Sequence, residues 1–143
     1  MKKLKIILSI ISFVLVLSIT LLFAYNMYTI YTFKRYSPHS QKNTEWVSQD
    51  GKIKFIVPEE GSGVGTITND NDELIDIIVV FYIGESTIEI WDASIRKNKV
   101  ADDLLLGKGY GTGYNKNSFL LKIKESSFFG DNQTIKFIKN QVK

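Results

Sequence analysis

The sequence predicts an all-β domain, a small antiparallel up-and-down meander of about eight strands, after an N-terminal transmembrane helix. Three observations lead to this prediction. Residues 6–33 form a run of 28 residues without a charged side chain. From residue 45 onward, apolar side chains recur with a period of two, which is the pattern of β-strands. Turn residues separate these segments at roughly 8–12 residues, so consecutive strands pair as neighbours and form a barrel or, alternatively, a sandwich.

Residues 1–35 have the composition of a signal-anchor helix. A membrane span needs about 20 apolar residues, and only serine and threonine interrupt the apolar run up to Phe23. Three lysines precede the run and the pair Lys34-Arg35 follows it. This small bias predicts a single-pass protein of the cell membrane with an extracytoplasmic C-terminal domain. A cleaved signal peptide is the alternative, although its apolar region usually has only about 7–15 residues.

Residues 36–44 are polar and contain a proline, which predicts a short linker before the β domain of residues 45–143. His39, the only histidine, lies in this linker and is expected to be solvated. The chain after residue 35 holds 13 Lys and Arg against 15 Asp and Glu, a net charge of −2. Nucleic acid is therefore not an expected partner. The expected partners are the membrane, through residues 6–33, and a small or lipidic ligand or an envelope protein.

The strands follow one another closely. Trp46 lies in the first strand, and Asp50-Gly51 predicts a type I′ hairpin turn to the second strand at 53–57. The strongest strand, 74–83, is apolar on both faces except for Asp76. The other strands are predicted at 64–68, 87–92 and 104–114, around 119–124 and around 135–137, with a loop or a helical turn at 93–103.

Four glycines recur with period two in one predicted strand: Gly107, Gly109, Gly111 and Gly113. One face of that strand would carry no side chain, and each interior glycine costs about 0.5–1 kcal/mol relative to alanine. The pattern predicts strand curvature, an aromatic side chain such as Trp46 lying across the glycines, or the mouth of a ligand cavity. In the last case, the four glycines and Trp46 contact the ligand. The spacing does not fit a phosphate-binding loop.

A second candidate site is the other face of strand 74–83. Ile78, Val80 and Tyr82 lie on that face, and Trp91 of the following strand can join them. If these side chains are exposed, they mark a contact with a partner or with the membrane.

The sequence offers little for catalysis. It contains no cysteine, and no motif for a metal or a cofactor; the acidic turn after residue 69 lacks the glycine and glutamate of a calcium loop. An envelope-polymer hydrolase would need two carboxylates at a set separation, and Asp76, Glu85 and Glu89 are the candidates. We therefore expect a non-enzymatic binding module. A structural or protein-interaction module of the cell envelope is the alternative, and a hydrolase is less favoured.

Short motifs within residues 45–138 resemble a family of short, uncharacterised exported or membrane-anchored proteins of Gram-positive bacteria. The resemblance implies an N-terminal export or lipoprotein segment, one small β domain and no catalytic motif. This chain has no lipobox cysteine, so a helix would anchor it. The opening tryptophan and the meander are also similar to lipocalin-like barrels, which implies a binding cavity. The residues that carry the family resemblance are Trp46-Val47-Ser48, Asp50-Gly51-Lys52-Ile53 with Phe55, Gly65-x-Ile67, Ile88-x-Ile90-Trp91-Asp92, Leu106-Gly107, Phe119-x3-Ile123 and Ile135-x-Phe137.

Overall fold

The computed structural model of the chain describes residues 2–58, 62–82, 86–93, 104–130 and 132–140. The chain forms two compact units, Met1–Thr32 and Phe33–Lys143. Helix α1 (Lys2–Tyr36) supplies the first unit and ends within the second. The predicted loop or helical turn at 93–103 lies outside the described residues, apart from Ala93.

Helix α1 has the length and composition of a membrane span. Its most apolar stretch of 18 residues has a mean hydropathy of 2.9. Among the described residues, it is the one helix that is both long enough and apolar enough to cross a membrane. Several hydroxyl groups within it bond back to helix carbonyls, which satisfies them in apolar surroundings. Ser18 Oγ donates to the Val14 carbonyl at 2.8 Å, and Thr20 Oγ1 donates to the Val16 carbonyl at 2.8 Å. The long apolar helix is compatible with a single membrane anchor.

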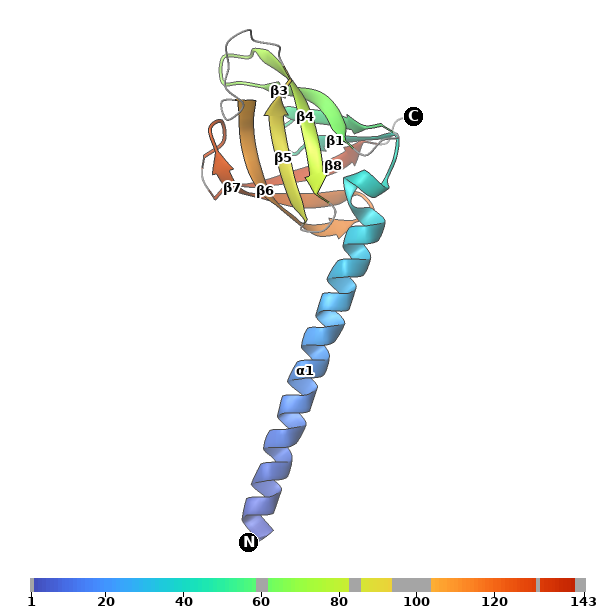
Figure 1. Cartoon of the computed structure of the whole chain (residues 1–143), viewed down its shortest axis with the longest axis vertical. Helices are drawn as coiled ribbons and strands as arrows, with labels where there is room; N and C mark the ends of the chain where they lie inside the picture. The colour runs from blue at the N-terminus through green and yellow to red at the C-terminus, as the bar shows by residue number, and fades with distance from the viewer. Residues whose placement is uncertain (1, 59–61, 83–85, 94–103, 131, 141–143) are drawn as a thin grey trace. The chain divides into compact units, whose positions relative to one another are not determined.

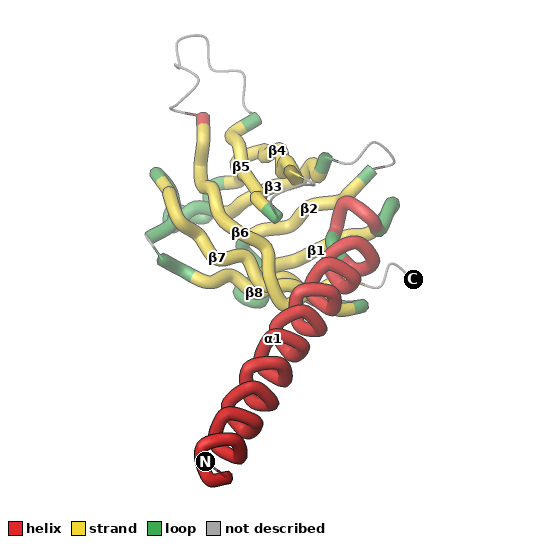
Figure 2. The backbone as a smooth tube through the Cα atoms, turned by 60° about the horizontal axis from the view of Figure 1, so that its bottom comes forward, coloured by secondary structure: helices red, strands yellow, loops and turns green. Residues whose placement is uncertain are grey.

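The second unit is a closed barrel of eight antiparallel strands (Figures 1 and 2). Each strand pairs with the next, and β1 closes the ring by pairing with β8, with Val47 opposite Ile138. The predicted all-β meander is confirmed, as a barrel rather than a sandwich. The strands are β1 (Thr44–Ser48), β2 (Ile53–Val57), β3 (Gly63–Thr68), β4 (Leu74–Tyr82), β5 (Thr87–Asp92), β6 (Leu105–Asn115), β7 (Ser118–Ser126) and β8 (Thr134–Asn140).

Side chains fill the interior of the barrel. Alternate residues of the strands point inward, and their buried apolar side chains form one core cluster. A barrel of eight strands is small enough to be filled in this way. An aromatic layer lies at the centre of the core cluster. The ring of Phe119 stacks on Tyr114 at 5.7 Å and on Phe137 at 5.0 Å, and the edge of Trp46 meets it at 5.4 Å. Each such pair of rings contributes about 0.5–1.5 kcal/mol beyond the apolar area that it buries.

The first hairpin differs from the prediction. A type I′ turn needs a positive φ at both of its central residues. Gly51 has a φ of 76° but the φ of Asp50 is not positive, so the prediction of a type I′ turn is wrong. The connection has four residues, and the Gly51 amide donates to the Ser48 carbonyl at 2.8 Å. The Asp50 carboxylate accepts the Lys52 amide at 3.1 Å, so a side chain stabilises the turn in place of a second left-handed residue.

The predicted linker of residues 36–44 belongs to the same compact unit as the strands, and Phe33 and Tyr36 pack against the core of the barrel. The division between the two units falls before Phe33, and the ring of Phe33 meets Tyr114 at 5.3 Å. A short 3₁₀ helix, η1 (Pro38–Ser40), follows. Lys139 Nζ donates to Gln41 Oε1 at 2.8 Å, which ties the segment to β8. We call this end of the barrel, covered by residues 33–41, the closed end.

His39 is not fully solvated, contrary to the expectation from its place in the chain. Its ring lies 5.2 Å from that of Phe33 and 6.3 Å from that of Phe81. Its Nδ1 shares a hydrogen bond of 2.8 Å with the Ser37 hydroxyl. Desolvation by burial lowers the pKa of His39, because the charged imidazolium loses water there. The histidine therefore serves the packing of the closed end.

Candidate functional site

The glycines of β6 are in close contact with other groups. A Cβ atom added to Gly111 would lie 1.7 Å from the Tyr114 hydroxyl, and one added to Gly107 would lie 2.8 Å from the ring of Phe129. At Gly109 the neighbour is the backbone of β7, with the Lys122 carbonyl oxygen 2.2 Å away. These contacts provide a packing reason for each of the three glycines.

Gly113 does not continue the glycine face. The pairing of β6 with β7 shifts between Thr112 and Asn115, and Gly113 is exposed with a positive φ of 61°. This bulge turns the next residue, Tyr114, into the barrel. Trp46, the other predicted ligand contact, is fully buried, and its indole nitrogen donates to Thr44 Oγ1 at 2.9 Å. Tyr114 and Phe129, rather than Trp46, supply the aromatic rings nearest these glycines. Ligand binding at Gly107 to Gly113 and Trp46 stays a prediction.

The second predicted site lies on the outer wall of the barrel. Ile78 and Tyr82 are exposed, and Val80 and Trp91 are partly buried. Ile78 stands directly opposite Trp91 in the pairing of β4 with β5.

Two further apolar residues extend this face. Ile56 stands opposite Val64, and Val64 stands opposite Ile78. The side chains of Ile56 and Val64 are exposed at 46% and 51%. The outer stripe, as we call the row Ile56, Val64, Ile78 and Trp91, therefore crosses β2 to β5 without a break. Sequence reasoning missed Ile56 and Val64, because the register that aligns β2 with β3 and β3 with β4 is not encoded in the pattern of any single strand.

A buried carboxylate holds the aromatic residues beside the outer stripe. Glu89 is only 7% exposed although it lies on the outer wall. Its Oε2 accepts hydrogen bonds from the Tyr82 hydroxyl at 3.0 Å and the Trp91 indole nitrogen at 3.1 Å. Lys108 Nζ lies 3.2 Å from its Oε1. The hydrogen bond to Glu89 raises the pKa of both Tyr82 and Lys108.

The consequence is that the polar ends of Tyr82 and Trp91 are directed toward Glu89. What these two residues offer to a partner is then mainly the carbon surface of their rings. Glu89 is thus a positioning residue for this face.

Replacing Glu89 by glutamine tests that role. The amide accepts fewer and weaker hydrogen bonds than the carboxylate, so the free energy of unfolding should fall by about 1–3 kcal/mol. Trp91 should also emit at longer wavelength, since it loses a fixed partner, whereas Trp46 is buried and should not change. The control is Asp76→Asn, an exposed carboxylate on the same wall, which should stay within about 0.5 kcal/mol of wild type. Unchanged stability and emission in Glu89→Gln would show that Glu89 does not hold the rings.

Two of the carboxylates considered for catalysis, Asp76 and Glu89, are not placed as a pair. Asp76 stands opposite Thr66, whereas Glu89 stands opposite Val80, four residues further along β4. That offset corresponds to roughly 13 Å along the strand, beyond the separation of glycosidase carboxylates. Glu85 lies outside the described residues. Within the described part of the chain, no group of three or more His, Cys, Asp or Glu could hold a metal ion.

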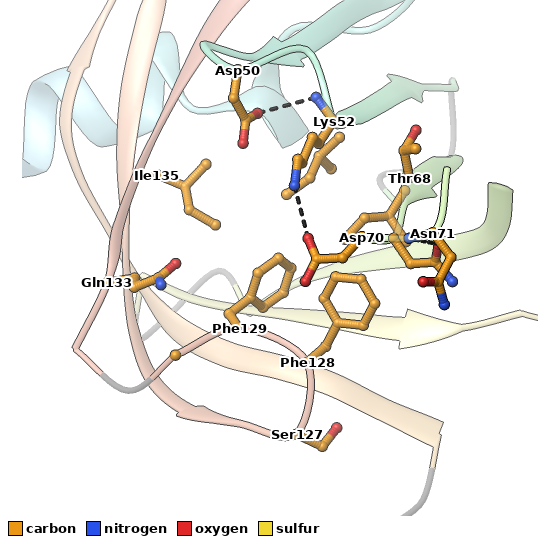
Figure 3. A pocket seen from close by; sticks show the side chains of 14 residues that line it. Asp50, Lys52, Thr68, Asp70, Asn71, Ser127, Phe128, Phe129, Gln133 and Ile135 are labelled. Atoms are coloured by element: carbon orange, nitrogen blue, oxygen red, sulfur yellow. Dashed lines mark hydrogen bonds and ion pairs between the residues drawn. The ribbon is translucent and has the colours of Figure 1, made fainter. Parts of the chain in front are cut away.

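A pocket of about 530 Å³ lies at the end of the barrel opposite residues 33–41, which we call the open end (Figure 3). It is lined by the β1–β2 and β3–β4 connections and by the segment after β7. Phe128, Phe129 and Ile135 supply apolar surface. Lys52 Nζ and Asp70 Oδ1 form an ion pair at 3.0 Å between the two hairpins. The sequence contained no signal for this pocket, because its lining comes from loops that only barrel closure brings together.

The fold defines the class of the protein: a small closed β-barrel with an N-terminal apolar helix. Comparisons with protein-family models, with curated proteins and with solved structures found no match to this chain.

Proposed function

We propose that this chain is a membrane-anchored, non-enzymatic protein-interaction module of the cell envelope, with its barrel on the extracytoplasmic side. The length of the uncharged run at residues 6–33 supports the anchor. The three lysines before the run, against Lys34 and Arg35 after it, support the orientation.

The observation that carries the proposal is the unbroken outer stripe. Four apolar side chains on adjacent strands, with Val80 and Tyr82 beside them, form a contiguous surface on a domain whose inner faces are already packed. Contiguous exposed apolar surface of this kind marks interaction sites. The alternative, a ligand beside Gly107 to Gly113, has less support, since Tyr114 and Phe129 lie against that strand.

The surroundings of the outer stripe indicate the chemistry of the partner. The β3–β4 hairpin and the start of β4 carry acidic side chains at Asp72, Glu73 and Asp76. A partner with an apolar ridge flanked by basic side chains would complement this face. Three strand spacings of about 4.8 Å make the stripe roughly 14 Å long. A stripe of that length buries less surface area than the interface of a stable dimer. The interaction is therefore transient, and confinement of both proteins to one membrane raises its occupancy.

Site-specific photo-cross-linking in membranes of the source organism tests the proposal. A benzophenone side chain at position 78, on the full-length chain, should form a discrete adduct with another protein. The matched control is position 136, where Lys136 is an exposed outward residue of β8. A second substitution, Val64→Lys, should reduce the adduct at least tenfold, because it buries a charge at the interface.

The same variant should unfold at the same denaturant concentration as wild type, since Val64 is exposed. Equal labelling from positions 78 and 136, or no protein adduct from position 78, would refute the proposal. An adduct of twice the chain's own mass would assign the face to self-association instead.

A further inference from the structure

The pocket at the open end has two chemically different sides. The rings of Phe128 and Phe129 meet edge to face at 5.2 Å and form an aromatic wall. Asp50, Lys52 and Asp70 form a charged rim that faces it (Figure 3). A volume of about 530 Å³ lies within the range of small-molecule sites.

The aromatic wall is held in place by the chain that follows β7. Ser126 Oγ accepts the amide hydrogen bonds of both Phe128 and Phe129. The Ser126 hydroxyl itself donates to the Leu106 carbonyl at 2.9 Å, which fixes this turn to β6. The ring of Phe129 then lies over Gly107, where a side chain would otherwise be. The wall is therefore pre-formed, which limits the ordering cost of binding a ligand.

The charged rim favours a positive ligand. Two of its three ionic side chains are carboxylates and one is an ammonium. Partial burial alone would raise the pKa of Asp50, but hydrogen bonds from the Ser48 hydroxyl and the Lys52 amide outweigh it and lower the pKa. Asp50 is therefore ionised at neutral pH. Lys52 and Asp70 are exposed, so their ion pair is weak and a ligand can compete for it.

We propose that this pocket binds an organic cation with an apolar body, whose charge lies between Asp70 and the faces of Phe128 and Phe129. Aromatic faces attract cations by about 0.5–2 kcal/mol, and the carboxylate adds a direct ion pair. The apolar body would contact the aromatic wall and Ile135. This site is separate from the outer stripe and does not depend on the protein-interaction role proposed above.

The test uses the full-length chain in nanodiscs of zwitterionic lipid, with isoleucine δ1-methyl groups labelled for NMR. Benzyltrimethylammonium is the probe, and 3-phenylpropionate is the matched anion that also carries a single ring. The cation should shift the methyl signals of Ile67 and Ile135, which line the pocket, in a saturable way. Ile88, in the core near Gly111, should not shift. The anion should leave all three unchanged.

Two variants at the rim give opposite expectations. Asp70→Asn should weaken binding of the cation by about two- to fivefold, because it removes the exposed ion pair. Lys52→Met should strengthen binding by a similar factor, because it removes the competitor for Asp70. Both residues are exposed, so neither change should unfold the barrel.

The two probes and the two variants test separately whether the pocket binds a ligand and whether that ligand is a cation. Saturable shifts with the anion, together with weaker binding in Lys52→Met, would overturn the assignment to a cation. Shifts with neither probe would overturn the site itself. Neither outcome would affect cross-linking at position 78, so the two proposals fail independently.

Discussion

Replacing Phe119 by alanine should lower the free energy of unfolding by about 3–5 kcal/mol. Phe119 is 1% exposed and lies between the stacked rings of Tyr114 and Phe137, with the edge of Trp46 against it. Its removal leaves a cavity among the three large rings that pack against it, and the cost of such a cavity adds to the lost burial. Urea unfolding followed by the fluorescence of Trp46 measures the effect.

The control is an aromatic residue on the outer wall of the neighbouring strand. Tyr110 of β6 is 44% exposed, so Tyr110→Ala should change the free energy of unfolding by less than about 1 kcal/mol. If Phe119→Ala and Tyr110→Ala lowered the free energy of unfolding equally, the aromatic layer would not be the centre of the core.

Replacing Gly109 by alanine should also destabilise the barrel strongly, by about 1–3 kcal/mol or more. The added Cβ atom would lie 2.2 Å from the Lys122 carbonyl oxygen and 3.0 Å from the Ile123 Cα atom. Both atoms belong to the backbone of β7, so the two strands must separate at a bulge in their pairing. Thermal unfolding of the purified variant, followed by far-ultraviolet circular dichroism, measures the loss.

Gly107→Ala is the matched control for this substitution. Its added Cβ atom would meet the ring of Phe129, at 2.8 Å, and no backbone atom is among its three nearest neighbours. The neighbour at Gly107 is the end of a side-chain ring and not a strand backbone, so the loss of stability should be smaller than for Gly109→Ala. Equal stability of Gly109→Ala and wild type would contradict the close approach of β7. A larger residue at Gly109 would report on folding rather than on ligand binding.

Local patterns in the sequence were sufficient for the elements of this protein. The uncharged run at 6–33 predicted the helix, and the alternation at Ile53, Phe55 and Val57 predicted a strand with its inward face. Both patterns depend only on residues close together in the chain. A helix or a strand repeats its side-chain directions with a fixed period, so the pattern of apolar residues indicates which element forms. The short turns likewise predicted the meander, because consecutive strands then pair.

The candidate site was predictable only in part. Ile78, Tyr82 and Trp91 belong to two consecutive strands, so their shared face could be anticipated. Their neighbours Ile56 and Val64 could not, because the register that aligns them with Ile78 is set by β2 and β3.

Tertiary structure alone decided the remaining features. Closure of β1 on β8 joins segments about ninety residues apart, and no local period encodes it. The same holds for the predicted linker of residues 36–44, whose polar composition gives no sign that residues 33–41 cover the closed end. Tyr114 points inward only because a bulge at Gly113 shifts the strand by one residue, which exchanges its two faces. The physical reason is common to all three: local sequence sets which conformations a segment can adopt, whereas contacts between distant segments select the one that buries its apolar surface.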